Sequence, residues 1–527
     1  MISRAVLRSL VAVLTVCCLT GLVVLRQPFQ LSQLSHFDAA SSTGLERMRD
    51  YTNLGLQRIQ GLLNGGCLRS DLAVELAHLD RLLAGYVAVP EQGYSHYTEV
   101  AEDDWPIDLN QYKGRHVFRL RYGNLKTQEL LMMTILELNM NIWATAVTQN
   151  FVDVESDEES IRVLLQQFYG KHPISETPQL QLEFLIGDLA QTVYESYPAE
   201  MDVSEDVGSS VDLFFRKYRD LHTIYSWFDL LVETYPDILE LVWIGQTFEG
   251  RDLKALRVSS HKEGSEDVKT IVITAGVHAR EWISTSSACY IIYKLIEDYE
   301  SGGRDAHYYL DNLDFLFIPV TNPDGYEYSW HSDRLWRKNR QETYHPRCWG
   351  IDIDHSFDFH FQKSDDLPCG EDYSGEEAFE SLESRIINQY LNETKHQHSI
   401  HGYIDLHSYA QEVLYPYAFS CSQMPRDEEN LLELAYGLSK AIRLSSGKSY
   451  GVLSACQDKG ADFLPALGSG SALDYMYHNR AYWAFQLKLR DSGNHGFLLP
   501  SRYIGPVGEE IYSAIKYFSA FVLNPEG

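Results

Sequence analysis

One short stretch restricts the fold of this chain more than any other. The apolar run Thr270–Ala275 is consistent with a buried strand, and it leads almost directly into His278 and Glu281. The segment that follows, Ser284–Tyr299, has the pattern of a helix. A strand that ends in a loop with His and Glu three residues apart can offer a nitrogen and an oxygen ligand to one Zn²⁺ ion. The sequence therefore predicts a metal site at the end of a sheet strand.

A third ligand lies far downstream. The strand-like run Tyr403–Leu406 ends at His407, so a second strand end can bring an imidazole to the same site. Two histidines and one glutamate leave the fourth position of a tetrahedral zinc open for water. This arrangement is typical of a catalytic rather than a structural zinc.

The length of 527 residues exceeds what one ordinary core holds, so two or three domains are expected. Between residues 112 and 197 the order strand, helix, strand, strand, helix, strand predicts a ferredoxin-like α+β domain. From residue 212 onward, apolar strand-like runs alternate with helical segments. That alternation favours an α/β fold, with a mixed sheet covered by helices on both faces and a site at the strand ends.

The N-terminus has the layout of a secretory signal peptide. Arg4 and Arg8 precede an apolar run from Leu10 to Leu25, which predicts a signal peptide at residues 1–26, with an uncleaved signal anchor as the alternative. No later segment approaches the length and apolarity of a membrane span. The formal net charge of −30 disfavours binding to nucleic acid or to an anionic membrane.

The cysteines also suit an oxidising compartment, in which they can pair, although the sequence does not give the connectivity. Six lie beyond the signal segment: Cys67, Cys289, Cys348, Cys369, Cys421 and Cys456. Proximity in sequence favours a Cys421–Cys456 pair, and Cys289, inside a helical segment, is expected to be a buried thiol. The triplet Asn392-Glu393-Thr394 predicts a glycan on Asn392.

Five motifs in order resemble the signature of the funnelin-type zinc carboxypeptidases, and the resemblance covers roughly Leu213 to Leu523. They are His278-Ala279-Arg280-Glu281, Asn322-Pro323-Asp324-Gly325-Tyr326, Trp336-Arg337-Lys338-Asn339-Arg340, His407-Ser408-Tyr409 and Leu489-Arg490-Asp491. A histidine considered alone is more often a hydrogen-bonded core residue. The ordered set outweighs that interpretation.

The resemblance implies a carboxypeptidase-like sheet of the eight-stranded type, one Zn²⁺ per chain on His278, Glu281 and His407, and a Cys348–Cys369 disulfide. It also implies that Arg340 polarises the scissile carbonyl and stabilises the oxyanion, because a guanidinium suits developing negative charge. By the same resemblance Arg280, Arg337 and Tyr409 belong to the peptide-binding cleft. For Arg337, a surface salt bridge is an equally good interpretation.

Three functions that such an enzyme requires lack the residue types that the family uses for them. Lys488 stands immediately before Leu489-Arg490-Asp491, where the family has its general-base Glu, and an ammonium has no acceptor for a proton. Asp354 and His355 replace the Asn-Arg pair that grips the peptide carboxylate. The tyrosine that closes over bound peptide is missing from residues 462–471. This pattern resembles the fungal inactive carboxypeptidase-like proteins, which are secreted or vacuolar and linked to cell wall organisation.

The predicted domains are a signal peptide at 1–26, an N-terminal extension at 27–111, a carboxypeptidase-type prodomain at 112–197, a linker at 198–211 and the zinc carboxypeptidase-like domain at 212–527. The linker contains no Lys or Arg, so a protease other than a trypsin-like one removes the prodomain, or it stays attached. The expected partners are this prodomain and a peptide or cell-wall-related protein.

Two interpretations of the cleft remain open. In the first, the chain is a zinc-containing pseudoenzyme that works by binding, and Lys488 pairs with a carboxylate, either Asp354 or one held on the metal. In the second, the chain is an active carboxypeptidase in which burial turns Lys488 into a neutral base. Asp354 would then select an amine-bearing ligand. A scaffold in the cell wall overlaps with the first interpretation.

Overall fold

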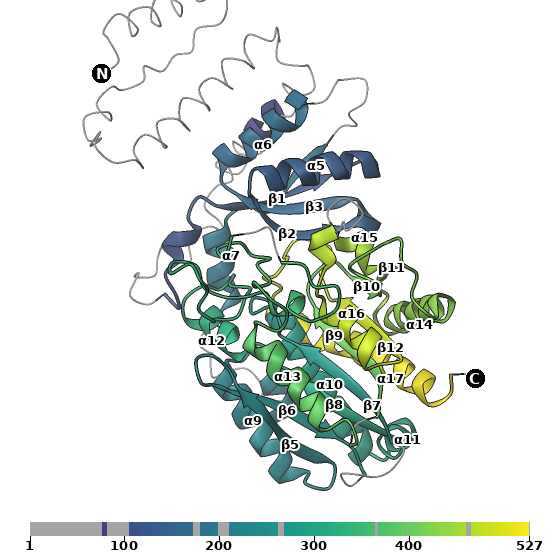
Figure 1. Cartoon of the computed structure of the whole chain (residues 1–527). Coiled ribbons are helices and arrows are strands. Elements are labelled where there is room, and N and C mark those ends of the chain that lie inside the picture. Colours follow the sequence, from purple (N-terminus) through teal and green to yellow (C-terminus); the bar gives the residue numbers. More distant parts are fainter. Residues whose placement is uncertain are drawn as a thin grey trace, which may run out of the picture. The chain divides into compact units, whose positions relative to one another are not determined.

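A computed structural model describes most of the chain downstream of residue 105 (Figure 1). The described residues are 76–81, 105–171, 180–198, 210–261, 268–363, 367–397, 399–459 and 465–525. The predicted signal peptide at 1–26, most of the predicted extension at 27–111 and most of the predicted linker at 198–211 lie outside them.

Residues 105–171 and 180–198 form a small unit that we call the four-stranded module. Its sheet has the order β2-β3-β1-β4, and all three strand pairs are antiparallel. The elements follow one another in the predicted order of strand, helix, strand, strand, helix, strand. They are η3 (Leu109–Tyr112), β1 (His116–Arg121), α5 (Leu125–Glu137), β2 (Asn141–Ala146), η4 (Val147–Gln149), β3 (Phe151–Ser156), α6 (Glu158–Lys171), β4 (Gln181–Ile186) and α7 (Leu189–Ser196).

The two faces of the module's sheet have different neighbours, as the alternation of side chains along a strand requires. Phe118 and Leu120 of β1 belong to one buried cluster with Leu131 of α5 and Leu164 of α6. Val117 belongs to a second cluster, which also contains residues from the C-terminal part of the chain. The module is therefore covered by its own helices on one face and by the rest of the protein on the other.

The second sheet has eight strands in the order β11-β10-β12-β9-β7-β8-β6-β5. The pairs β7–β8, β7–β9, β9–β12 and β10–β11 are parallel, whereas β5–β6, β6–β8 and β10–β12 are antiparallel. The strands are β5 (Leu239–Gln246), β6 (Asp252–Val258), β7 (Lys269–Ala275), β8 (Leu313–Ile318), β9 (Ser399–His407), β10 (Glu412–Tyr415), β11 (Gly451–Ser454) and β12 (Trp483–Lys488). The predicted mixed sheet of eight strands is confirmed.

Helices cover both faces of this sheet. Gly402 and Tyr403 are neighbours on β9 and point to opposite faces. A Cβ on Gly402 would lie 2.4 Å from the Phe518 ring of α17, whereas Tyr403 shares a small cavity with Met476 of α16. The helical elements are α8 (Ser210–Phe215), α9 (Leu221–Thr234), α10 (Trp282–Glu300), α11 (Arg304–Leu310), α12 (Pro323–His331), η5 (Ile353–His355), α13 (Leu382–Glu393), α14 (Glu428–Ser446), α15 (Ala455–Lys459), η6 (Pro465–Gly468), α16 (Ala472–Asn479), η7 (Ser501–Tyr503) and α17 (Ile504–Leu523).

The topology brings three distant segments to one place. Strands β7, β9 and β12 are adjacent and parallel, so their carboxyl ends meet at the same edge of the sheet. His407 ends β9 and lies directly opposite Lys488, which ends β12. The loop after β7 carries His278 and Glu281 to the same edge.

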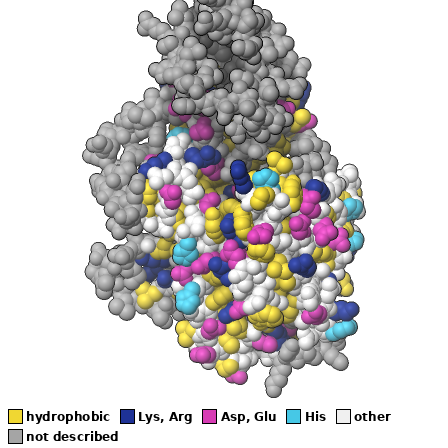
Figure 2. Space-filling view, turned by 60° about the vertical axis from the view of Figure 1, so that its left-hand side comes forward, with side chains coloured by type: hydrophobic (Ala, Val, Ile, Leu, Met, Phe, Trp, Pro, Cys, Tyr) yellow, Lys and Arg dark blue, Asp and Glu magenta, His cyan; other side chains and the backbone are white. Residues whose placement is uncertain are grey.

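On the face shown in Figure 2, Asp and Glu side chains are interspersed with Lys, Arg and hydrophobic ones. Within the described ranges, none of the helices combines the length and the apolarity that crossing a bilayer requires.

Candidate metal centre

Three side chains converge at the carboxyl ends of β7 and β9. His278 Nδ1 lies 2.9 Å from Glu281 Oε1 and 3.2 Å from His407 Nδ1, and His407 Nδ1 lies 3.3 Å from Glu281 Oε2. All three residues are at least 97% buried. Ligand atoms about 3.3 Å apart are what a tetrahedral Zn²⁺ with bonds of about 2.0 to 2.1 Å requires. The predicted ligand set is brought together, and its donor atoms fit one zinc ion with one position left open.

Buried carboxylates fix the orientation of both imidazoles. His278 Nε2 lies 3.2 Å from Asp352 Oδ1, and His407 Nε2 lies 3.1 Å from Asp405 Oδ2. Contacts of this kind at the far ring nitrogen leave Nδ1 available as the metal ligand. Burial by itself would raise the pKa of Asp352, but the charges of Arg337 and His278 hold it well below its usual range.

The loop that carries His278 is braced by the Asn322 motif. Asn322 Nδ2 donates to the carbonyls of Val277 at 3.1 Å and Lys338 at 3.0 Å, and its Oδ1 accepts from the Gly325 N–H at 2.8 Å. Gly276 adopts a φ of 62°, and a Cβ there would lie 2.4 Å from Thr285 Oγ1. These contacts explain why the second motif accompanies the metal ligands in sequence.

Lys488 is held by two carboxylates at the position next to the metal ligands. Its Nζ forms an ion pair with Asp458 and lies 3.8 Å from Glu412 Oε2. Burial by itself would lower the pKa of Lys488, but the charges of Asp458 and Glu412 outweigh it and raise that pKa. The side chain is therefore an ammonium, which has no lone pair to accept a proton.

Lys488 pairs with a carboxylate, as expected, but its partner is Asp458 rather than Asp354. Asp354 lies 3.4 Å from Gln486 Nε2 and 3.6 Å from His355 Nε2 instead. Sequence reasoning missed Asp458 and Glu412. The available signal was an acidic residue, Glu412, at the start of the strand β10, because a buried carboxylate needs a cation or hydrogen-bond donors.

The assignment of the arginine that faces the metal is corrected by the structure. Arg337 lines the cavity at the metal centre, and its Nη1 lies 3.4 Å from His278 Nδ1. Arg340 instead places its guanidinium 3.7 Å from the ring centroid of Tyr328 and 4.6 Å from that of Trp336. The aromatic rings of Tyr328 and Trp336 stack on Arg340, so Arg337 rather than the predicted Arg340 is the arginine that faces the metal ligands.

The remaining predicted cleft residues are all buried. Arg280 donates to Glu371 Oε2 at 3.2 Å and lies 4.2 Å from the ring centroid of Phe497. His355 lines the cavity and has its Nδ1 2.9 Å from the Ser469 carbonyl oxygen. Asp354 is 1% exposed and lies 3.6 Å from His355 Nε2.

The cavity has a volume of about 120 Å³ and is walled from two sides. The metal ligands, Arg337, His355, Tyr409 and Lys488 form one side, and residues of α5 and β2 of the four-stranded module, among them Trp143, form the other. The module therefore forms part of the wall of the site in this structure.

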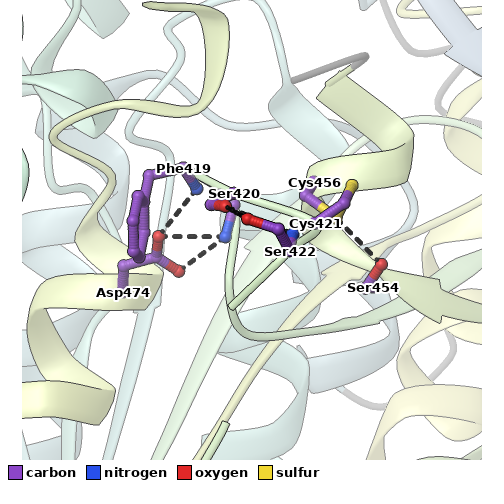
Figure 3. Close-up of a disulfide and its surroundings, with 8 residues drawn as sticks. Phe419, Ser420, Cys421, Ser422, Ser454, Cys456 and Asp474 are labelled. Carbon is purple, nitrogen blue, oxygen red and sulfur yellow. Dashed lines mark hydrogen bonds between the residues drawn. A yellow bond between two sulfur atoms is a disulfide. The ribbon is translucent and has the colours of Figure 1, made fainter. Parts of the chain in front are cut away.

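Two disulfides are present among the described residues. Cys348 pairs with Cys369, as the resemblance implied, and Cys421 pairs with Cys456. Figure 3 shows the second bridge beside the segment whose backbone N–H groups, at Ala418 and Phe419, donate to the Asp474 carboxylate. Cys456 lies on α15, the short helix that carries Asp458, so this bridge anchors the element that holds Lys488.

The other cysteine and glycan predictions have different outcomes. Cys289 is buried and outside any disulfide, as predicted. Asn392 is exposed near the end of α13, where its Oδ1 accepts from Arg480 Nη2 at 2.6 Å. A glycan on Asn392 stays a prediction.

The comparisons with known proteins agree with this geometry. The profile of the zinc carboxypeptidase family matches residues 224–514. The inactive metallocarboxypeptidase ECM14 of Saccharomyces cerevisiae is 49% identical over 419 residues, which are 79% of this chain and 93% of that protein. The protein of the same name from Ajellomyces dermatitidis is 39% identical over 79% of this chain and 73% of its own length.

Solved structures show the same architecture. Thrombin-activatable fibrinolysis inhibitor is 25% identical, with a TM-score of 0.65 over 78% of this chain and all of that one. Carboxypeptidase A from Helicoverpa armigera, at 22% identity, shares the fold with a TM-score of 0.66 over 79% of this chain and 99% of its own. The family match spans more than half of the sequence, and the chain belongs to the zinc carboxypeptidase family.

Proposed function

We propose that this chain is a zinc-binding carboxypeptidase homologue that has lost peptide hydrolysis and works by binding. The observation that carries the proposal is the ion pair of Lys488 with Asp458. The family resemblance puts a carboxylate base at this position, to take a proton from water. An ammonium fixed between two acidic side chains cannot perform that step.

The charges around the carboxylate-binding position support the same conclusion. Asp354 and His355 stand where the resemblance expects an amide and a guanidinium. A buried carboxylate repels the C-terminal carboxylate of a peptide, and an imidazole cannot make the two parallel hydrogen bonds of a guanidinium. The relatives from Saccharomyces cerevisiae and Ajellomyces dermatitidis are themselves named as inactive.

The residues that would hold zinc are intact, and we propose one ion per chain. His278 and Glu281 come from the segment after β7, and His407 comes from the end of β9. Zinc bound there would supply a Lewis acid and would tie these segments together. Without a base beside it, its main contribution would be structural, because metal binding to a folded site stabilises that fold.

The cellular role follows from the resemblance alone. We propose that the chain enters the secretory pathway through residues 1–26 and is secreted or vacuolar, where it contributes to cell wall organisation by binding a peptide or a cell-wall-related protein. Residues 112–197 would be its carboxypeptidase-type prodomain, residues 198–211 the linker, and Asn392 a glycan site. Nucleic acid is not among the expected partners, given the formal net charge of −30.

The test is release of C-terminal residues from a mixed peptide set, read by mass spectrometry, with zinc content measured on the same sample. We expect about one zinc per chain and no release, with and without the module. An active family member in parallel controls for the peptides and the buffer. Release that a chelator abolishes would overturn the proposal and favour an active enzyme with an altered base and specificity.

A further inference from the structure

One of the two carboxylates beside Lys488 also contacts the four-stranded module. This residue is Glu412, the first of β10, and it is fully buried. Its Oε2 lies 3.8 Å from Lys488 Nζ, and its Oε1 accepts a hydrogen bond of 2.7 Å from Thr148 Oγ1 of η4. One carboxylate therefore connects the residue at the base position with the β2–β3 connection of the module.

The next residue of η4 binds the same segment of chain. Gln149 Nε2 donates to the Ala410 carbonyl at 2.9 Å. A Cβ on Gly451, at the start of β11, would lie 2.7 Å from the Thr148 side chain, so the module packs against the sheet without a gap there. Ala410 also forms a small buried cluster with Ala146 and Phe151 of the module.

A second set of polar contacts also crosses the interface. Arg119 and Asp153, on β1 and β3, form a bidentate ion pair with distances of 2.8 Å and 2.7 Å. Asp153 also accepts from the Tyr409 hydroxyl at 2.7 Å, and Arg119 Nη1 donates to the Ser492 carbonyl at 2.7 Å. Arg119, Asp153 and Tyr409 are each at most 3% exposed, so these groups would become exposed and partly unpaired without the module.

Apolar packing completes the contact. Leu335, Tyr409, Phe497 and Leu498 belong to one buried cluster with Trp143 and other residues of the module. The rings of Trp143 and Phe497 lie 5.2 Å apart between centroids. An interface with an apolar centre and several buried hydrogen bonds is typical of a stable association rather than of a transient cover.

We propose that Lys488 is a positioning residue for the docking of the four-stranded module, acting through Glu412 on Thr148, and that the module stays bound when the chain between them is cut. The residue at the position of the family's general base thereby stabilises the interface with the module. The ammonium neutralises the buried Glu412 carboxylate and keeps it in place to accept from Thr148. This role does not depend on whether the chain hydrolyses peptides.

The experiment uses the full chain with the recognition sequence of a site-specific protease inserted between Asp202 and Asp206. After complete cleavage we expect the two pieces to co-elute in gel filtration at about 1 µM protein. The dissociation constant is then measured by labelling the module and following its exchange. Elution as two separate species at that concentration would overturn the proposal.

Two variants test the role of Lys488. Thr148→Val removes the hydrogen bond to a carboxylate, and we expect it to weaken the association by about ten- to hundredfold. Lys488→Met should weaken the association by at least about tenfold, and Lys488→Arg should largely restore it. Thr148→Val in the Lys488→Met background should then have a smaller effect than it has alone.

Two controls separate this role from general damage. Thr234→Val removes an exposed hydroxyl on α9 that bonds to the Leu230 carbonyl of the same helix, and it should leave the association unchanged. Zinc content shows whether each variant keeps its metal site. Additive effects of Thr148→Val and Lys488→Met, or an unchanged affinity for either, would overturn the role of Lys488. Peptide release from the same samples tests the proposed loss of hydrolysis independently.

Discussion

Restoring the family's carboxyl at the base position, by Lys488→Glu, should damage the protein rather than repair it. The substitution removes the cation from a buried set in which Asp458 is 2% exposed and Glu412 is fully buried. Breaking a buried pair by removing one partner costs about 3–5 kcal/mol. The introduced carboxyl adds repulsion from both acids, so we expect the free energy of unfolding to fall by at least that amount at pH 7.

The assay is urea unfolding followed by tryptophan fluorescence and compared with the parent chain. Lys363→Glu is the matched control, because Lys363 pairs with Glu376 at the surface, where its side chain is 55% exposed. That change should cost less than about 1 kcal/mol. Adding Glu412→Gln and Asp458→Asn to Lys488→Glu should recover most of the lost stability, because the like charges are removed.

Two results would refute the reasoning. The first is Lys488→Glu with the same unfolding midpoint as the Lys363→Glu control. The second is zinc-dependent peptide release by Lys488→Glu alone, because this would mean that the two acids do not prevent the carboxyl from acting as a base.

Three further predictions concern other parts of the chain. Burial raises the pKa of Glu383 to about 7, so its ionisation destabilises the fold and stability falls as the pH rises from about 4.5 to about 7. Glu383→Gln should therefore raise the unfolding free energy by about 3 kcal/mol at pH 8 and leave it unchanged at pH 4, and equal effects at both pH values would contradict this. Replacing Cys421 and Cys456 by Ser should cost about 2–4 kcal/mol in urea unfolding, with Cys289→Ser as the control for a lost thiol. His407→Ala should abolish stoichiometric zinc binding and lower the unfolding temperature, and full zinc content in that variant would contradict the ligand assignment.

Sequence reasoning located the metal ligands because they depend on local patterns. His278 and Glu281 share one loop after a strand, and His407 ends a second strand that the apolar pattern predicts. Because the carboxyl ends of parallel strands meet at one edge of the sheet, these three residues were expected to lie together. The sheet type followed from the alternation of strands and helices for the same reason. These inferences needed no knowledge of individual side-chain contacts.

The errors concern the direction in which a side chain points and the pairing of residues that are distant in sequence. Arg337 and Arg340 lie in one motif, and only the surrounding rings of Tyr328 and Trp336 show which guanidinium turns away from the metal. Asp458 is 30 residues from Lys488 in sequence, on a helix of five residues that the pattern did not reveal.

The buried acids also explain how a lysine can sit beside a metal site. Exchanging Glu for Lys adds two positive charges next to a divalent cation, and Asp458 and Glu412 together supply two negative charges when both are ionised. The net charge near the zinc ligands is then close to that of a site with a single glutamate.

Zinc affinity should therefore depend on the sum of the charges of Lys488, Asp458 and Glu412 rather than on Lys488 itself. Lys488→Met should tighten zinc binding, Asp458→Asn should weaken it, and the two changes together should largely cancel, as competition with a chromogenic chelator would show. Equal affinities in all three variants would mean that these charges are too well screened to act on the metal.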